Sequence, residues 1–246
     1  MTDNALADLP PLALFSGLRR LDLSYNSLRD ASGVSALAGN GSPLSELYLT
    51  SNKLRSSAPV RGLLALEVLE LGSNRLRAVE GLEGMSRLRD LWLGRNKIAS
   101  LAGGALPPAL GGALTRLSVQ SNRLTRIEGL DALGQLQELY LSHNGISVME
   151  GLGELRELRV LDLSANAIPR IQGLEGCPKL TDLWFSSNKV ESLDGLGEAL
   201  GAQRETVTTI YLEGNPAAKD DPEYRAKVLA ALPRLEQLDA NPVVRR

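Results

Sequence analysis

Leucine recurs along the chain in a fixed order with asparagine. One copy of the pattern, Leu-x-x-Leu-x-Leu-x-x-Asn-x-Leu, runs from Leu18 to Leu28. The asparagine of the pattern returns after 22, 26 or 27 residues, at Asn26, Asn52, Asn74, Asn96, Asn122, Asn144, Asn166, Asn188 and Asn215. A single unit of this length cannot bury its own leucines, so the pattern predicts units that stack on one another.

Each unit contains a short stretch in which apolar and polar residues alternate. In the first unit, Leu21 and Leu23 alternate with Arg20, Asp22 and Ser24. This is the period of a strand with one buried face, and neighbouring strands of such units pair in parallel into a curved sheet. The sequence therefore predicts an α/β fold: a leucine-rich-repeat solenoid of about nine 22-residue units, with a concave parallel sheet and a C-terminal helical cap.

The pattern also divides the chain into three parts. We expect a short N-terminal segment over 1–17, leucine-rich repeats over 18–217 and a C-terminal cap over 218–246. The cap should begin its helix at Asp220–Pro222, an acidic N-cap with proline in the first turn, and Leu235 and Leu238 should add a last half-turn. The longer units carry inserts rich in Gly or Pro, such as 102–113, which we expect on loops.

The repeated asparagines are candidates for a structural role. We expect each of them to be buried, with its amide bonded to backbone groups at the turn after the strand. Because a buried polar group without a partner costs about 1–3 kcal/mol, this role explains the repetition without any functional site.

The outward-facing position between the two strand leucines of each unit carries an unusual set of side chains. The chain has nine aromatic residues, and five of them fall on these nine positions. In chain order the positions hold Asp22, Tyr48, Glu70, Trp92, Ser118, Tyr140, Asp162, Trp184 and Tyr211. A row of outward Trp and Tyr predicts a protein contact. Stacking on neighbouring strands is the alternative explanation.

Charge adds to this prediction. The outward columns of the sheet hold eight carboxylates and only two bases, Arg20 and Arg116, in a chain of net charge −2. A concave face that is acidic and aromatic should bind a partner with basic and apolar groups, and it disfavours a nucleic-acid backbone.

Catalytic chemistry has little support in the sequence. The only histidine is His143 and the only cysteine is Cys177, in different units, and neither a metal-ligand spacing nor a phosphate-binding glycine loop occurs. We therefore expect no enzymatic activity, no metal and no cofactor. With a single cysteine, no signal peptide and no apolar run of membrane length, we expect a soluble intracellular protein.

At several stretches the sequence resembles the leucine-rich regulatory subunits of type-1 serine/threonine protein phosphatase, the regulatory subunit 7 family. The resemblance extends from about residue 18 to the C-terminus. It is carried by Leu69–Ala78, Gln120–Thr125, Ile127–Leu130, Glu138–Ile146, Tyr211–Pro216, Tyr224–Arg225, Lys227–Val228 and Ala231–Pro233.

The resemblance implies a non-catalytic subunit whose concave face holds the phosphatase catalytic subunit and controls its activity or assembly. Trp92 and Trp184 would be apolar anchors, and Glu70, Asp162 and Asp182 would pair with Lys or Arg of the phosphatase. The matching positions are Asp22, Tyr48, Glu70, Trp92, Asp162, Asp182, Trp184 and Tyr211, and Tyr140 joins them from its place in the outward row. The resemblance further implies a nuclear and cytoplasmic protein, monomeric on its own, with room for an inhibitor subunit in the same assembly and no contact with membranes.

Two other functions stay open at this point. The same repeat type occurs in ciliary and spliceosomal adaptors, which a partner screen that finds no phosphatase would favour. An enzyme is the third alternative, which hydrolysis of a generic phosphoester by the purified chain would support.

Overall fold

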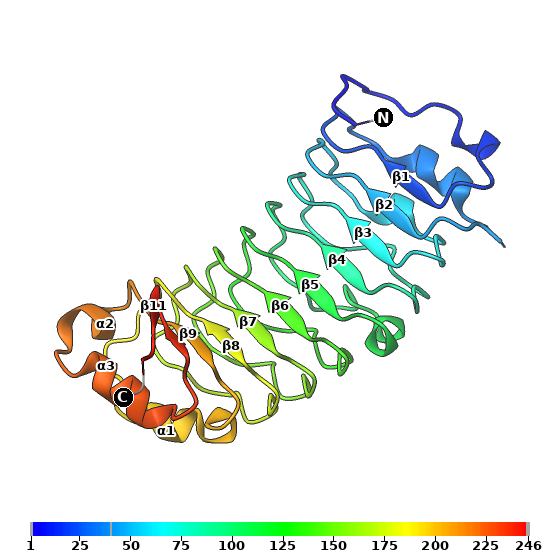
Figure 1. Ribbon diagram of the computed structural model, residues 1–246. Coiled ribbons are helices and arrows are strands. Elements are labelled where there is room, and N and C mark those ends of the chain that lie inside the picture. The colour runs from blue at the N-terminus through cyan, green and yellow to red at the C-terminus, as the bar shows by residue number, and fades with distance from the viewer. Residues whose placement is uncertain (1, 40, 245–246) are drawn as a thin grey trace. The chain divides into compact units, whose positions relative to one another are not determined.

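The computed structural model describes residues 2–39 and 41–244, and the chain divides into two compact units, Met1–Arg123 and Leu124–Arg246. We call them unit 1 and unit 2 and describe each by itself. Within each unit, successive short strands lie side by side and are joined by long loops (Figure 1). The predicted leucine-rich-repeat solenoid is confirmed.

Unit 1 contains five parallel strands in chain order. Their pairing is in register, so that Leu47 is opposite Leu21 on one side and Leu69 on the other. The strands are β1 (Arg20–Asp22), β2 (Glu46–Tyr48), β3 (Val68–Glu70), β4 (Asp90–Trp92) and β5 (Arg116–Ser118). The loops between them contain short 3₁₀ helices, η1 (Leu12–Leu14), η2 (Ser32–Leu37), η3 (Ala58–Val60) and η4 (Pro108–Gly112).

Unit 2 repeats this arrangement and adds the C-terminal cap. Its parallel strands are β6 (Glu138–Tyr140), β7 (Val160–Asp162), β8 (Asp182–Trp184), β9 (Thr209–Tyr211) and β10 (Gln237–Leu238), and β11 (Asn241–Pro242) pairs antiparallel with β10. Its helices are α1 (Leu196–Ala199), η5 (Gly201–Gln203), α2 (Pro216–Asp220) and α3 (Tyr224–Ala231).

The leucines of each repeat form the core beneath the strands. In one repeat of unit 1, Leu69, Leu71 and Leu76 are all buried, and the equivalent positions of the other repeats are buried as well. Each fully buried leucine contributes about 1.5–3 kcal/mol relative to an exposed one, which is why stacked repeats are stable while one repeat alone is not.

The repeat asparagines form a ladder beside this core. The Asn52 Nδ2 donates to the carbonyls of Leu23 (2.9 Å) and Leu49 (3.1 Å), and its Oδ1 accepts from the backbone N–H of Leu28 (3.0 Å). Asn74 makes the same set of bonds one repeat later. Each asparagine thus joins its own turn to the turn of the preceding repeat.

The residue before the asparagine adopts a left-handed backbone conformation in eight repeats. Its φ lies between 53° and 56°, although none of these residues is glycine. The eight are Tyr25, Ser51, Ser73, Arg95, Ser121, His143, Ala165 and Ser187. This conformation costs an L-residue roughly 1–2 kcal/mol, and the hydrogen bonds of the asparagine turn hold it in place.

The insert of the fourth repeat was predicted as a loop, and this prediction was only partly right. Over 102–113 the chain turns and then forms η4, and Leu106 and Leu110 are buried. Two buried leucines anchor the insert in the core, because even a Gly/Pro-rich segment packs when it supplies apolar side chains at the right spacing.

The C-terminal cap differs from its prediction in two details. The first helix, α2, starts at Pro216, and α3 starts only at Tyr224, because Asp221 bonds the backbone N–H of Glu223 and forms the turn between them. Leu238 belongs to β10 rather than to a helical half-turn, since β10 pairs in parallel with β9 and continues the sheet.

A turn near the N-terminus escaped the sequence analysis. Asp3, with φ of 53°, and Asn4 bond to the next repeat as the later asparagine turns do, and the Leu6 N–H donates to Asn26 Oδ1 at 3.1 Å. Asn4 precedes Asn26 by one 22-residue period, so residues 3–6 form a further asparagine turn. Among the described residues, no helix combines the length and apolar character needed to cross a bilayer.

Candidate functional site

The outward side of each parallel sheet carries the nine predicted site residues. We call the outward strand positions of β1–β5 the strand face of unit 1, and those of β6–β9 the strand face of unit 2. Unit 1 holds Asp22, Tyr48, Glu70 and Trp92, and unit 2 holds Tyr140, Asp162, Asp182, Trp184 and Tyr211. The strand period places them there, because their neighbours in the strands are the buried leucines.

In unit 1, Arg20 covers one of the aromatic rings. Its guanidinium carbon lies 4.6 Å from the centroid of Tyr48 and its Nη1 lies 3.3 Å from Glu46 Oε2. The Tyr48 hydroxyl donates to the same carboxylate at 2.9 Å. Burial, together with this hydrogen bond, raises the pKa of Tyr48. One base, one acid and one aromatic side chain therefore stabilise one another.

The second base of unit 1 repeats this arrangement. Arg116 Nη1 lies 2.7 Å from Asp90 Oδ1, and its guanidinium carbon lies 6.0 Å from the ring centroid of Trp92. From the sequence, Arg116 is recognisable only as one of two bases on the outward columns. Its role beside Trp92 depends on a contact between neighbouring strands β4 and β5, which the pairing register of the repeats could have indicated.

The other two carboxylates of the site in unit 1 have no ion pair with any described residue. Asp22 Oδ1 accepts the backbone N–H of Ser24 at 3.0 Å, and Glu70 is half-buried between Tyr48 and Trp92 in the pairing register. Asp22 and Glu70 are thus the carboxylates of this strand face whose charge is not balanced within unit 1.

Unit 2 carries an aromatic cluster centred on Trp184. Its ring lies 6.1 Å from that of Tyr140 and 6.3 Å from that of Tyr211, with the second pair edge to face. Such pairs contribute about 0.5–1.5 kcal/mol beyond their buried area. Asp162 lies on the strand between Tyr140 and Trp184, where it is buried and accepts the N–H of Ser164 at 2.9 Å.

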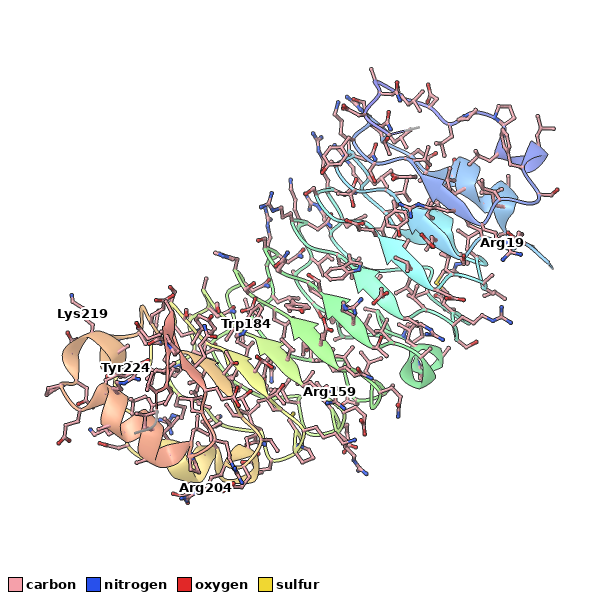
Figure 2. All side chains as sticks on the ribbon, viewed as in Figure 1. Arg19, Arg159, Trp184, Arg204, Lys219 and Tyr224 are labelled. Atoms are coloured by element: carbon pink, nitrogen blue, oxygen red, sulfur yellow. The ribbon has the colours of Figure 1, made fainter. Side chains whose placement is uncertain are left out.

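The indole of Trp184 has an unusual polar atom. Its Nε1 is buried, yet it has no hydrogen-bond acceptor among the described residues. Trp184 is labelled in Figure 2, where it lies among the strands of unit 2. A buried donor without an acceptor costs about 1–3 kcal/mol, so the ring contacts of Trp184 have to offset this cost.

The strand face of unit 2 carries acidic residues and no basic ones. Its outward strand positions include Glu138, Asp162 and Asp182, Glu213 follows β9, and none of these positions carries Lys or Arg. Two of these carboxylates accept local hydrogen bonds, from Tyr140 Oη to Glu138 at 2.8 Å and from Thr181 Oγ1 to Asp182 at 2.6 Å. The two strand faces therefore differ in composition, because the outward strand positions of unit 1 include Arg20 and Arg116 and those of unit 2 include no base.

One contact of the site comes from the cap. Gln237 of β10 donates through Nε2 to the hydroxyl of Tyr211 and to the carbonyl of Asp239. Gln237 is not among the predicted site residues, because the sequence predicts a helical half-turn over this stretch. Gln237 lies opposite Thr209 in the sheet, and from there its side chain reaches the Tyr211 hydroxyl.

The single cysteine and the single histidine of the chain lie in different environments. Cys177 is buried, and burial raises the pKa of its thiol to about 12, so it is protonated at neutral pH. His143 is exposed on an asparagine turn. Among the described residues, no group of three His, Cys, Asp or Glu side chains could hold a metal ion.

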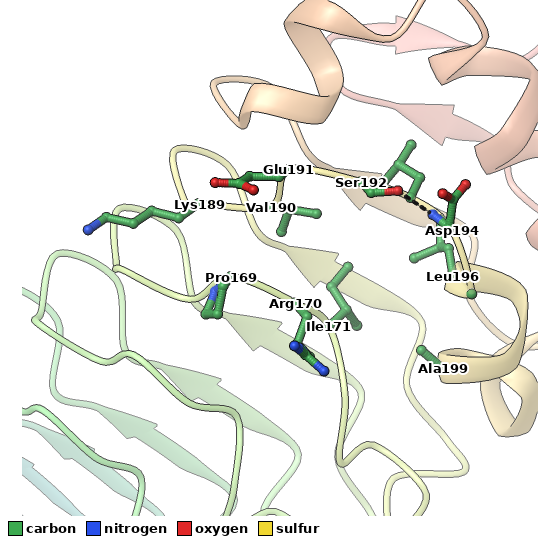
Figure 3. Close-up of a pocket in the computed structure, with 12 residues that line it drawn as sticks. Pro169, Arg170, Ile171, Lys189, Val190, Glu191, Ser192, Asp194, Leu196 and Ala199 are labelled. Atoms are coloured by element: carbon green, nitrogen blue, oxygen red, sulfur yellow. Dashed lines mark hydrogen bonds between the residues drawn. The ribbon is translucent and has the colours of Figure 1, made fainter.

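A surface cavity of about 420 Å³ lies in unit 2, away from the strand face (Figure 3). It is lined by parts of the loops after β7 and β8 and by α1, including Arg170, Glu191 and Asp194. The Asp194 backbone N–H donates to Ser192 Oγ at its rim. Its lining combines these charged groups with the Ser192 hydroxyl, and neither Cys177 nor His143 belongs to it.

Comparisons with known proteins agree with the repeat architecture. The family model described as "Leucine-rich repeat" matches residues 113–246. Two solved structures share the fold: the functional domain of InlJ from Listeria monocytogenes, with a TM-score of 0.73 and 21% identity, and a leucine-rich-repeat protein of Leptospira interrogans, with 0.69 and 23%. Each covers 96% of this chain, which spans 46% of the first structure and 64% of the second.

A curated relative is much more similar in sequence. It is the protein phosphatase 1 regulatory inhibitor subunit PPP1R7 homolog of Arabidopsis thaliana, which is 46% identical over 241 residues. The match covers 98% of this chain and 71% of the relative. At this identity and coverage, the chain belongs to the protein phosphatase 1 regulatory subunit 7 family of leucine-rich-repeat proteins.

Proposed function

We propose that this chain is a non-catalytic regulatory subunit that binds the catalytic subunit of type-1 serine/threonine protein phosphatase through its strand faces. The observation that carries the proposal is the row of outward aromatic and acidic side chains, in a chain 46% identical to a named phosphatase regulator. An apolar anchor surrounded by carboxylates is suited to a protein surface that presents basic and apolar groups.

The strand face of unit 2 supports the strongest anchor. Trp184 is flanked by Tyr140 and Tyr211, and together they form an aromatic surface of the kind that dominates binding energy at interfaces. Asp182 lies beside this surface, half-buried and without a base nearby on the strands. Here a Lys or Arg of the phosphatase would meet carboxylate charge that the chain itself leaves unbalanced.

The strand face of unit 1 supports a second contact. Tyr48 and Trp92 already carry guanidinium groups from Arg20 and Arg116, so a partner would add to these stacks or displace them. Asp22 and Glu70 would then supply the charge for basic residues of the phosphatase.

The finer features of the assembly belong to the same proposal. We expect the chain to be monomeric on its own, to act in the nucleus and cytoplasm, and to leave access for an inhibitor subunit while it controls phosphatase activity or assembly. The three-part division at 1–17, 18–217 and 218–246 also stays a prediction, with the strand faces in the middle part.

The direct test is calorimetric binding of the purified chain to the phosphatase catalytic subunit. The Trp184→Ala variant should lose about 2 kcal/mol of binding free energy or more, roughly thirtyfold in affinity. Tyr25→Ala is a matched control, because Tyr25 is an exposed aromatic residue on an asparagine turn outside both strand faces. Its affinity should equal that of the wild type.

Each alternative outcome has a distinct meaning. Equal affinities for the Trp184 variant and the wild type would keep the partner but move the binding site away from unit 2. Absence of binding by a folded wild type would contradict the phosphatase proposal and favour an adaptor function.

A further inference from the structure

A regular row of basic side chains follows the asparagine turns of unit 1. The residue directly after the asparagine is basic in four consecutive repeats, and the residue two positions later is basic in three. We call this set the basic ladder, which comprises Lys53, Arg75, Lys97 and Arg123 in the first row and Arg29, Arg55 and Arg77 in the second.

Backbone hydrogen bonds fix the spacing of the first row. The N–H of Arg75 donates to the Leu54 carbonyl at 2.8 Å, and the N–H of Lys97 donates to the Leu76 carbonyl at 2.8 Å. Lys53 and Arg123 make the equivalent bonds in their repeats. Consecutive rungs are therefore about one strand spacing apart, ~4.8 Å. The order of the positive charges is thus set by the fold.

The charges of the basic ladder are not balanced by neighbouring carboxylates. None of its seven residues forms an ion pair with a described residue, and six are exposed while Lys53 is half-buried. The acids closest in sequence, Asp30 and Glu80, accept hydrogen bonds from Ser32 and Ser56. Nitrogen-tipped side chains project from the edge at which the strands of unit 1 end (Figure 2).

Unit 2 shows that the repeat fold does not require these charges. The positions equivalent to the first row are Gly145, Ala167 and Lys189, and those of the second row are Ser147, Pro169 and Glu191. The same backbone bonds form there, with Gly145 N–H donating to Leu124 O at 2.7 Å. The basic ladder is therefore a property of the surface of unit 1 and not of the repeat.

We propose that the basic ladder of unit 1 is a docking surface for an acidic, extended segment of a partner polypeptide. Five of its seven bases are arginine, whose planar fork pairs with a carboxylate through two hydrogen bonds. Basic side chains in successive repeats can pair with an extended partner segment that runs along the repeats and turns its glutamate or aspartate side chains toward them. This surface lies beyond the asparagine turns and is separate from the strand face.

The surroundings favour a polypeptide over a nucleic acid or a membrane. Single-stranded nucleic acid is usually held by aromatic stacking beside basic groups, and no ladder position carries an aromatic side chain. Between the two rows, Leu54 and Leu76 are buried, so the ladder offers no exposed apolar side chain for insertion into a bilayer.

The test uses the full chain and a fluorescein-labelled oligoglutamate peptide long enough to span the ladder, followed by fluorescence anisotropy at low salt. The double variant Arg75→Glu, Arg77→Glu should bind about tenfold more weakly or worse, because two reversed charges repel the peptide. The double variant Arg87→Glu, Arg89→Glu is the matched control. It lies in the same unit, makes the same change in net charge and alters two exposed arginines that precede β4.

The control should keep most of the affinity, and thermal melts should show both variants folded. Equal loss in the two double variants would overturn the proposal, because the peptide would then respond only to net charge. The proposal would also fail if oligothymidine or phosphatidylserine vesicles bound in a ladder-dependent way and the peptide did not. None of these results depends on the phosphatase, so failure here leaves the function proposed for the strand faces untouched.

Discussion

The rings of Tyr140 and Trp184 lie 6.1 Å apart between centroids, although the whole of β7 separates the strands that carry them. Two strand spacings would place their Cα atoms roughly 10 Å apart. The two side chains therefore lean toward each other over Asp162, which is only 7% exposed on the strand between them. The aromatic cluster of unit 2 thus acts as a cover over a carboxylate.

Trp184 gives a stability test of this arrangement. Trp184→Ala should lower the free energy of unfolding by roughly 1–3 kcal/mol, less than for a fully buried tryptophan, because the side chain is half-buried. Trp184→Phe keeps a ring and removes the N–H that lacks an acceptor, so the unfolding free energy should change by less than about 1 kcal/mol. Urea denaturation measures both, and equal losses would show that the ring contacts do not stabilise the cluster.

Asn74 tests the asparagine ladder. Asn74→Ala removes the acceptor for the Leu54 N–H and the donor to the carbonyls of Leu49 and Leu71. Each buried backbone group left without a partner costs about 1–3 kcal/mol, so the unfolding free energy should fall by at least about 2 kcal/mol. Asn241→Ala, at an exposed position of β11, should have almost no effect in the same chemical denaturation experiment. A loss of similar size at both positions would argue against a special role for the repeat asparagine.

Tyr224 predicts how stability depends on alkaline pH. Its hydroxyl donates to Asp239 Oδ2 at 2.8 Å, and burial, followed by this hydrogen bond, raises the pKa of Tyr224 above its ordinary value of 10.0. The folded state therefore keeps the proton at a pH where the unfolded state loses it. The stabilisation is complete below pH 10.0 and is lost as the pH rises above that value.

Tyr224→Phe should accordingly flatten the fall of the unfolding free energy above pH 10.0, as followed by denaturation at a series of pH values. A smaller slope should remain, because the pKa of Tyr48 is also raised. An unchanged slope in the Phe variant would mean that the tyrosine in α3 is not linked to folding.

The cap gives a test by truncation. A chain that ends at Asp221 loses α3 and β10, and with them Val228 and Leu232, which are completely buried in the folded protein. The uncovered leucine core should lower the melting temperature and cause aggregation, which sedimentation velocity would detect. A chain that ends at Ala240 loses β11, whose residues are exposed, and should stay monomeric. If the shorter chain is also monomeric with unchanged melting, capping by α3 is wrong.

Much of the fold could be predicted because every repeat carries the same pattern of leucines and asparagine, so each repeat supports the same strand assignment. The outward position of Trp92, for example, follows from Leu91 and Leu93 on either side of it, and every repeat supports the same strand. The cap occurs only once, so no other part of the sequence supports its assignment. Gln237–Leu238 extends the sheet without the asparagine that marks the other turns, so its strand character depends on pairing with β9. The spacing of Leu235 and Leu238 therefore predicts a helical half-turn where the sheet continues.

The alternation of residues along each strand places the site residues on the outward face. It does not indicate which of their side chains contact one another. Arg116 lies beside Trp92 and Tyr140 beside Trp184 only because of side-chain rotamers across strands, about which a sequence period says nothing. Asn4 shows the opposite case. The 22-residue spacing to Asn26 was present in the sequence, but only Asn4 and Leu6 of the pattern precede the first complete repeat.

The left-handed residue before each repeat asparagine limits how this protein can diversify. At Ser73, for example, a β-branched side chain such as Val or Ile would clash with its own backbone, so substitution there is restricted to residues that tolerate positive φ. Arg75, two positions after Ser73, has no such restriction. Its backbone N–H donates to the neighbouring repeat, and its side chain is free to vary. Sequence drift can therefore change the surface chemistry at one side of the asparagine while the turn itself is preserved. Family members with the same fold could in this way acquire different partners along that edge.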